Sequence, residues 1–132
     1  MSFPVFDLHC DTALALLGKS MKEAGSLRNN PHHIDLQRAQ QLAGYAQCFG
    51  CFTTPDMEKW YHVPVAEIFE REMVTVLREV EKNKDLISLA YTAEDVRRNF
   101  ENKKMSFLTA KKFIVAFFRT INALACFLCI IL

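Results

Sequence analysis

The sequence predicts an α/β fold in which short parallel strands alternate with helices. Two observations support this prediction. Short apolar runs bounded by polar or turn-forming residues, typical of buried strands, occur at residues 5–7, 45–52, 86–91 and 105–108. The segments between them are long enough for the helical crossovers that parallel strands require. We therefore expect a parallel sheet or barrel that binds ligands at the carboxyl ends of its strands.

Two short helices are expected around the first two strands. Residues 12–17 form an apolar run that ends at Gly18, a residue type that commonly terminates helices. Residues 19–33 are polar and contain Gly-Ser and Asn-Asn-Pro turn signals, so we expect an irregular loop there. A second short helix is expected over residues 36–43, directly before the strand at 45–52.

The clearest helix is expected over residues 64–82. Its apolar residues recur in steps of three and four and form one stripe, which comprises Val65, Ile68, Phe69, Met73, Val76, Leu77 and Val80. The charged residues assigned to the opposite face are Glu67, Glu70, Arg71, Arg78, Glu79 and Glu81. A further helix is expected to begin at Thr92, a favourable N-cap residue followed by acidic residues, and to precede the strand at 105–108.

Composition is that of a globular domain with one core. The chain has 132 residues, of which 51% are hydrophobic and 23% charged, and its formal net charge is +1. A charge so close to zero gives no general attraction to nucleic acid, and we expect no nucleic-acid partner. No basic region followed by an apolar stretch opens the sequence, so we expect a cytoplasmic protein whose five cysteines are thiols.

His9 and Asp11 are the first candidate functional residues. They are two positions apart at the end of the first apolar run, so on a strand both side chains would project from one face. An imidazole nitrogen beside a carboxylate oxygen forms half of a divalent-metal site. The alternative is that Asp11 only caps the following helix and that His9 is a surface residue.

The segment around this pair resembles a known family. Asp-Leu-His-Cys-Asp at residues 7–11 is similar to the Asp-Gly-His-Asn-Asp opening of the membrane (renal) dipeptidase family of zinc peptidases. His-Ile-Asp-Leu-Gln-Arg at residues 33–38 resembles the family's His-Val-Asp-Ile-Pro-Arg segment, and Gly-Tyr-Ala-Gln-Cys-Phe at residues 44–49 resembles its Gly-Gly-Gln-Phe strand. Together with the order of the helices, the resemblance covers roughly residues 3–109.

The resemblance implies a (β/α)8 TIM-type barrel with two zinc ions at the top of its strands. In the family the His-x-Asp pair belongs to one metal, a Glu from a later strand bridges both, and two later His complete the second metal. Carried over by position, His9 and Asp11 are the metal ligands that this chain retains. The implied function is zinc-dependent hydrolysis of dipeptides, in which the two ions activate a water molecule.

The pattern departs from the family after Ala110. Lys111 and Lys112 stand where the family has an acidic residue, and the remaining sequence is an apolar run. A complete barrel needs about 250 residues. We therefore expect residues 1–110 to be the N-terminal portion of an incomplete barrel, in a truncated and inactive copy of the enzyme. Residues 111–132 are expected to be a divergent tail that forms an apolar helix, either a frameshift product or a membrane-spanning segment.

A second function remains open from the sequence. Residues 113–132 are long enough to cross a bilayer, so the chain could instead be a small non-enzymatic α/β protein that this helix anchors to a membrane. Two Cys-x-x-Cys pairs, at residues 48–51 and 126–129, could form a zinc ribbon, but burial is the ordinary state of cysteine and we interpret them as buried thiols. The histidines at 32–33 are interpreted as a solvated loop pair.

Overall fold

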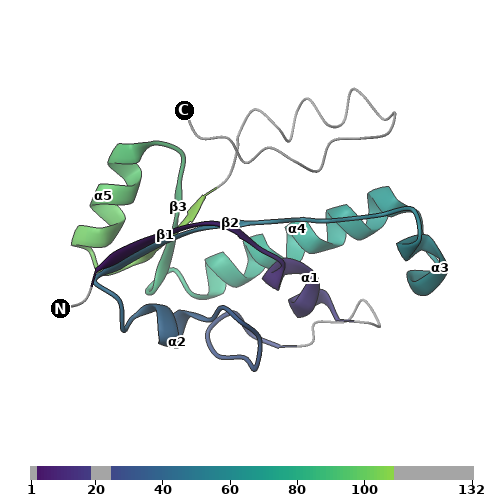
Figure 1. Cartoon of the computed structure of the whole chain (residues 1–132), viewed down its shortest axis with the longest axis horizontal. Coiled ribbons are helices and arrows are strands. Elements are labelled where there is room, and N and C mark those ends of the chain that lie inside the picture. Colours follow the sequence, from purple (N-terminus) through teal and green to yellow (C-terminus); the bar gives the residue numbers. More distant parts are fainter. Residues whose placement is uncertain (1–2, 19–24, 109–132) are drawn as a thin grey trace.

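The structure is a computed structural model that describes residues 3–18 and 25–108. Its strands and helices alternate along these residues (Figure 1). In chain order they are β1 (Pro4–Cys10), α1 (Thr12–Leu17), α2 (Leu36–Ala39), β2 (Gly44–Phe49), α3 (Met57–Tyr61), α4 (Val65–Lys82), β3 (Ile87–Ala90), α5 (Ala93–Glu101) and β4 (Met105–Leu108). The α/β class expected from the sequence is confirmed.

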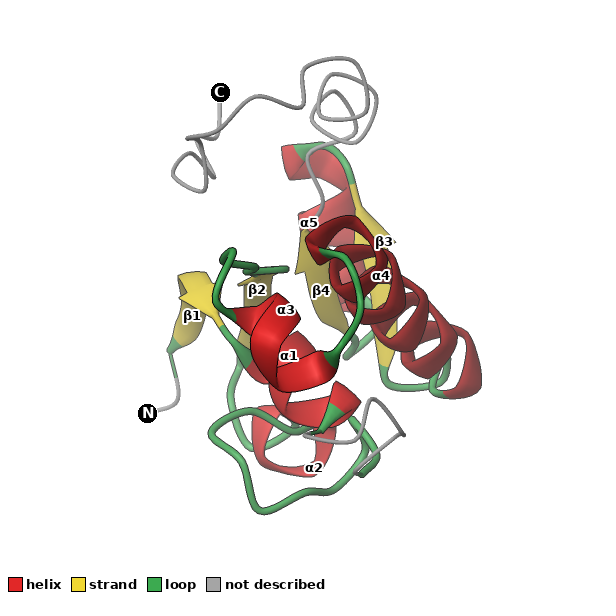
Figure 2. Cartoon of the chain, turned by 90° about the vertical axis from the view of Figure 1, so that its right-hand side faces the viewer, coloured by secondary structure: helices red, strands yellow, loops and turns green. Residues whose placement is uncertain are grey.

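All pairings between the described strands are parallel, in the order β1-β2-β4-β3. Figure 2 shows β1 at one edge and β3 at the other, with β2 and β4 between them. The strands of a (β/α)8 barrel follow one another in chain order, whereas here β4 lies between β2 and β3. The described residues therefore form a four-stranded parallel sheet, and the barrel remains a proposal.

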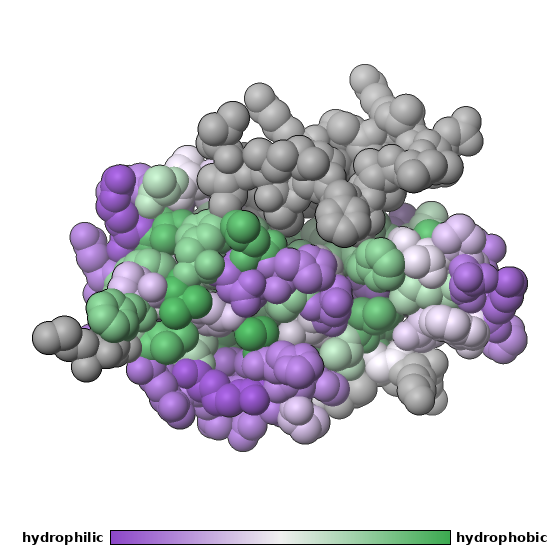
Figure 3. All heavy atoms as spheres, in the orientation of Figure 1, coloured by the Kyte–Doolittle hydropathy of each residue, from purple (hydrophilic) through white to green (hydrophobic). Residues whose placement is uncertain are grey.

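The edge position of β1 changes one expectation. Residues 5–7 were predicted to form a buried strand, yet Val5 and Phe6 are 38% and 47% exposed, and Leu8 is 54% exposed. Within the described residues β1 pairs only with β2, so its second edge has no strand beside it. Apolar surface is visible in Figure 3 near the N-terminus, where β1 lies.

Helix α4 covers the core, and helix α1 packs against α4 (Figure 1). The predicted apolar stripe is confirmed at Ile68, Val76 and Val80, which are buried. Two assignments were wrong. Leu77 is 41% exposed, and Glu79, assigned to the solvated face, is 2% exposed. The reason is that Glu79 lies under the loop that precedes α2.

That loop is fixed to α4 by polar contacts. The Glu79 carboxylate accepts hydrogen bonds from the Leu27 backbone N–H at 2.7 Å and from the Ser26 hydroxyl at 3.1 Å, and Lys82 donates to it at 2.9 Å. Although burial opposes the shift, these donors lower the pKa of Glu79. The loop was expected to be irregular, and its described part contains no helix or strand before α2.

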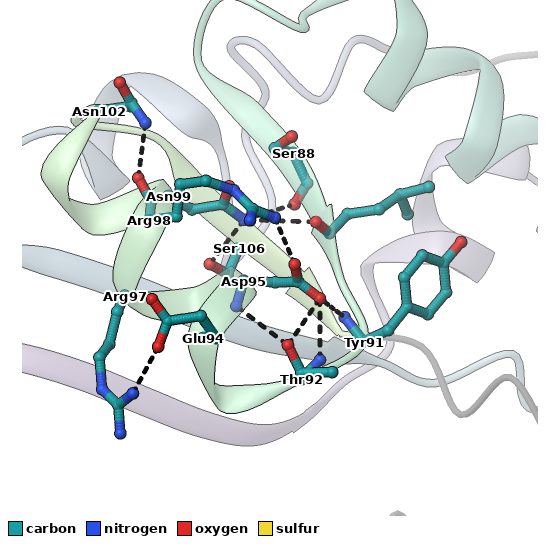
Figure 4. A network of polar contacts seen from close by, with 11 residues as sticks. Ser88, Tyr91, Thr92, Glu94, Asp95, Arg97, Arg98, Asn99, Asn102 and Ser106 are labelled. Atoms are coloured by element: carbon teal, nitrogen blue, oxygen red, sulfur yellow. Dashed lines mark hydrogen bonds and ion pairs between the residues drawn. The ribbon is translucent and has the colours of Figure 1, made fainter.

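The N-terminus of α5 follows the predicted capping (Figure 4). The Thr92 side chain accepts a hydrogen bond from the Asp95 backbone N–H at 3.1 Å, and the Asp95 carboxylate accepts one from the Thr92 backbone N–H at 3.0 Å. This reciprocal pair satisfies donors that the first helical turn leaves free. Deeper in the same network, the buried Asn99 amide donates to the Ser106 hydroxyl of β4 at 3.1 Å.

Several element boundaries differ from those expected. Helix α2 ends at Ala39 rather than at residue 43, and β2 ends at Phe49 rather than at residue 52. The short helix α3 was not predicted, because five residues provide too little periodicity. Among the described residues, no helix is both long enough and apolar enough to cross a bilayer. The apolar helix expected at 113–132 lies outside the described residues.

Candidate metal centre

His9 and Asp11 lie side by side where β1 ends. The His9 Nε2 atom is 3.0 Å from the Asp11 Oδ1 atom, and the two side chains are 61% and 62% exposed. The predicted proximity is confirmed, but its expected cause was wrong. Strand β1 ends at Cys10, its register with β2 shifts between Asp7 and Cys10, and Asp11 already stands at the N-cap of α1. A turn of the chain, rather than a shared strand face, brings the two side chains together.

The alternative interpretation, in which Asp11 caps the following helix, is correct for the position of Asp11 but not for its hydrogen bonding. Asp11 occupies the N-cap of α1, yet its side chain accepts no capping hydrogen bond. Its carboxylate instead contacts the His9 imidazole. The Asp11 carboxylate is therefore directed to His9, and both groups face solvent.

Gly50, directly after β2, lies against the His9 imidazole. A Cβ atom at this position would be 2.7 Å from His9 Cε1, closer than real Cβ atoms approach, and 3.1 Å from His9 Nδ1, which is a tight contact. The Gly50 backbone N–H also donates to the Cys10 carbonyl at 2.9 Å. The absence of a side chain at Gly50 thus sets where the imidazole sits. This residue was missed in the sequence, where it is only the second inner residue of a Cys-x-x-Cys pair.

A polar network joins β1 to β2 next to the end of the sheet at which His9 and Asp11 lie. The Asp7 carboxylate accepts hydrogen bonds from the His9 backbone N–H at 3.1 Å and from the Tyr45 hydroxyl at 3.3 Å. The same hydroxyl lies 2.5 Å from Gln47 Oε1, and Gln47 is fully buried. Burial, followed by the negative charge of Asp7, raises the pKa of Tyr45. The phenol therefore remains neutral and donates.

Glu72 on α4 is a buried carboxyl group near the same end of the sheet. It is 0% exposed, and neither of its carboxylate oxygens makes a hydrogen bond of standard geometry among the described residues, although the Phe52 backbone lies close to the carboxyl group. Burial and the negative charge of Asp11 raise its pKa to about 8, and the Phe52 backbone opposes the shift. Sequence reasoning missed Glu72, although a signal exists: it is four residues from both Ile68 and Val76, within the apolar stripe of the helix.

Other candidate groups do not join this site. The described residues contain no group of three or more His, Cys, Asp or Glu side chains placed to hold one metal ion. Cys48 is buried, as expected, and Cys51 is a partly buried thiol, while residues 126–129 lie outside the described residues. His33 is exposed, as predicted, but His32 is half-buried, and its Nε2 has no hydrogen-bond partner among the described residues.

Residues 1–113 match the family model of the membrane dipeptidases, peptidase family M19. The chain belongs to this family. The resemblance seen in the sequence is thereby confirmed, and peptide hydrolysis holds at the level of the family. No protein with a curated description matches the chain.

This M19 chain shares its fold with a solved structure. It is a metallopeptidase from Rhodobacter sphaeroides, crystallised with a phosphinate mimic of the dipeptide L-Ala-D-Ala. The TM-score is 0.59 and the sequence identity 18%, over 82% of this chain. The match spans only 38% of the Rhodobacter chain. The likeness therefore concerns the fold of a portion of that protein.

Proposed function

We propose that this chain supplies one half of the metal centre of a zinc-dependent dipeptidase, with His9 and Asp11 as its ligands. The observation that supports this most directly is the 3.0 Å separation of His9 Nε2 and Asp11 Oδ1. Zinc binds imidazole nitrogen and carboxylate oxygen at about 2.0–2.2 Å, and two such ligands at the tetrahedral angle are about 3.3 Å apart. A small rotation of either exposed side chain is enough to fit one cation.

The surrounding residues suit this role because they hold His9 in place. Asp7 accepts the His9 backbone N–H, and Gly50 leaves room for the imidazole. Bound zinc ions would polarise a substrate carbonyl and lower the pKa of a water molecule toward neutrality. The residues of this chain would hold and orient that centre at the end of β1, where ligands bind in parallel α/β folds.

The proposed substrate is a dipeptide. The family assignment supports this, since the M19 peptidases are membrane dipeptidases. The His9–Asp11 pair supplies two ligands, and Lys111 and Lys112 stand where the family pattern has an acidic residue. A lysine ammonium is a donor only and cannot ligate a cation. We therefore propose that the 132-residue chain binds metal weakly and does not turn over dipeptides.

Metal titration tests the proposal. Isothermal titration of the metal-free chain with Zn²⁺ should show one site, and His9→Ala and Asp11→Asn should each abolish it. The control is His33→Ala, which removes an exposed imidazole from a loop. Absence of any Zn²⁺ site in the wild-type chain, or equal binding by His9→Ala, would overturn the assignment. Measured dipeptide turnover by the purified chain would refute the proposed inactivity while leaving the ligand assignment intact.

A further inference from the structure

Strand β1 has the residue pattern of an interior strand but lies at the edge of the described sheet. Its neighbour β2 is buried on both faces from Tyr45 to Phe49. On β1, by contrast, the adjacent residues Val5 and Phe6 point to opposite faces and both are exposed. Apolar side chains on both faces are typical of parallel strands that are covered on both sides, and β1 contains no lysine of the kind that protects free edges.

Four exposed apolar side chains on and next to β1 form a surface that we call the β1 patch. They are Phe3, Val5, Phe6 and Leu8, which are between 38% and 70% exposed. With about 200 Å² of surface for each side chain, the exposed area amounts to roughly 400 Å². A standard protein–protein interface buries about 800 Å² on each partner. A second copy of this chain that joined through the β1 patch alone would therefore bury only about half of that area.

The same chain contains an apolar segment within reach of the β1 patch. Residues 113–132 lie outside the described residues, and Arg119 is the one charged residue in their sequence. The described part ends at Leu108 of β4, and only β2 separates β4 from β1 (Figure 2). The free side of β1 is three strand spacings from β4, about 14 Å, and the chain from residue 108 to residue 113 spans up to about 17 Å when extended.

A segment of the same chain also has an advantage over a separate partner. A short linker keeps an attached segment at an effective concentration in the millimolar range, so no partner has to be captured from solution. Contact between the segment and the β1 patch would remove two apolar surfaces from water at once, which is favourable in proportion to their area.

We propose that residues 113–132 pack along the free side of β1 and cover the β1 patch. The apolar segment is then part of the folded domain rather than a membrane anchor, and it completes the burial that β2 has on both faces. This inference goes beyond the proposed function, since it does not depend on metal binding by His9 and Asp11.

Photocross-linking of the full 132-residue chain tests the contact directly. A benzophenone amino acid replaces Phe6, which is 47% exposed, or Trp60 of α3, which is 70% exposed and serves as the control position. After irradiation at low micromolar concentration, mass spectrometry should find position 6 joined to residues 113–132 within one chain. A link between two chains, no link to this segment, or equal linking from position 60 would overturn the proposal.

The same irradiation in the presence of phosphatidylcholine vesicles separates packing on β1 from insertion into a bilayer. The link from position 6 to residues 113–132 should persist when vesicles are added. Loss of the link together with flotation of the chain with the vesicles would overturn the proposal and assign the segment to the membrane.

Hydrogen exchange of the β1 amides provides a second measurement. Phe117→Asp places a charge in the apolar segment, and Leu77→Asp makes a similar change at a 41% exposed position of α4. The amides of residues 5–8 should exchange at least about tenfold faster in Phe117→Asp than in wild type or Leu77→Asp, because the free side of β1 would open to water. Equal exchange of these amides in the two variants would overturn the proposal.

Discussion

Replacing Gly50 by alanine should move the His9 imidazole without disturbing the fold. The new Cβ would be 2.7 Å from His9 Cε1, so the ring must retreat by about 0.7 Å to reach the 3.4 Å of an ordinary contact. The ring can do so because the His9 side chain is 61% exposed. Gly50 is not among the described residues with a positive φ, and the new Cβ would be 3.3 Å from the Cys10 carbonyl oxygen, so the backbone needs to adjust by only a few tenths of an ångström; the free energy of unfolding should change by less than about 1 kcal/mol.

A displacement of this size matters for metal binding. Ligand distances at metal sites are defined within about 0.2 Å, and a shift of about 0.7 Å at Cε1 exceeds that tolerance. Gly50→Ala should therefore weaken Zn²⁺ binding at least about tenfold in isothermal titration. In metal-free protein, ¹H–¹³C NMR should show a shifted His9 Cε1–H signal, a readout that does not depend on metal.

Gly25→Ala is the matched control, because its Cβ would meet only Asn30 and Leu16 atoms at 3.8 Å. Zn²⁺ affinity should be unchanged in this variant. The reasoning is refuted if Gly50→Ala and Gly25→Ala bind Zn²⁺ equally well, or if the His9 signal stays in place in Gly50→Ala. Loss of the folded state in Gly50→Ala would equally contradict the view that the exposed imidazole yields to the new methyl group.

Three further changes test packing and polar contacts within the fold. Glu79→Ala leaves the buried Leu27 N–H without its acceptor and should lower the free energy of unfolding by about 2–3 kcal/mol in urea titrations. Because hydrogen-bond donors lower the pKa of Glu79, the stability that Glu79 contributes should be complete above its ordinary pKa of 4.5 and should disappear as pH falls through the lower pKa of the folded state. In a chelator, wild type should lose stability relative to Glu72→Gln, on the order of a few kcal/mol, as pH rises from 4.5 to 8, because the folded chain holds the proton of the Glu72 carboxyl group more tightly than the unfolded chain does. Parallel curves of stability against pH for the two proteins would contradict the raised pKa of Glu72. Gly44→Ala places a Cβ 2.7 Å from the Phe100 ring, which packs α5 on the sheet, and should lower stability by about 1–3 kcal/mol in thermal melts; a wild-type melting temperature would refute that contact.

Local signals in the sequence predicted the elements that depend on their own residues. The bounds of α1 and β4 agree with those expected, and Thr92 caps α5 because its partner Asp95 is only three residues away. The apolar spacing in α4 located that helix within one residue at its start. The family resemblance carried by the segment around His9 is likewise confirmed.

Features that depend on distant partners could not be read in this way. The burial of Glu79 follows from Leu27, 52 residues earlier in the chain, and helical periodicity alone assigns that glutamate to solvent. The placement of β4 between β2 and β3 is a property of the sheet and leaves no mark in any single strand. The contact of Gly50 with His9 depends on the pairing of β1 with β2. The two-residue spacing of His9 and Asp11 was visible in the sequence, but the turn of the chain that brings their side chains together was not.

The two candidate ligands also lie at one edge of the sheet. Strand β1 pairs with β2 alone within the described residues, and edge strands of this kind detach from a sheet more readily than central ones. An ion that joins the last residues of β1 to the first turn of α1 would be released whenever β1 detached. By thermodynamic linkage, each tenfold excess of free ion over its dissociation constant would suppress detachment by about 1.4 kcal/mol, so occupancy and local order would rise together.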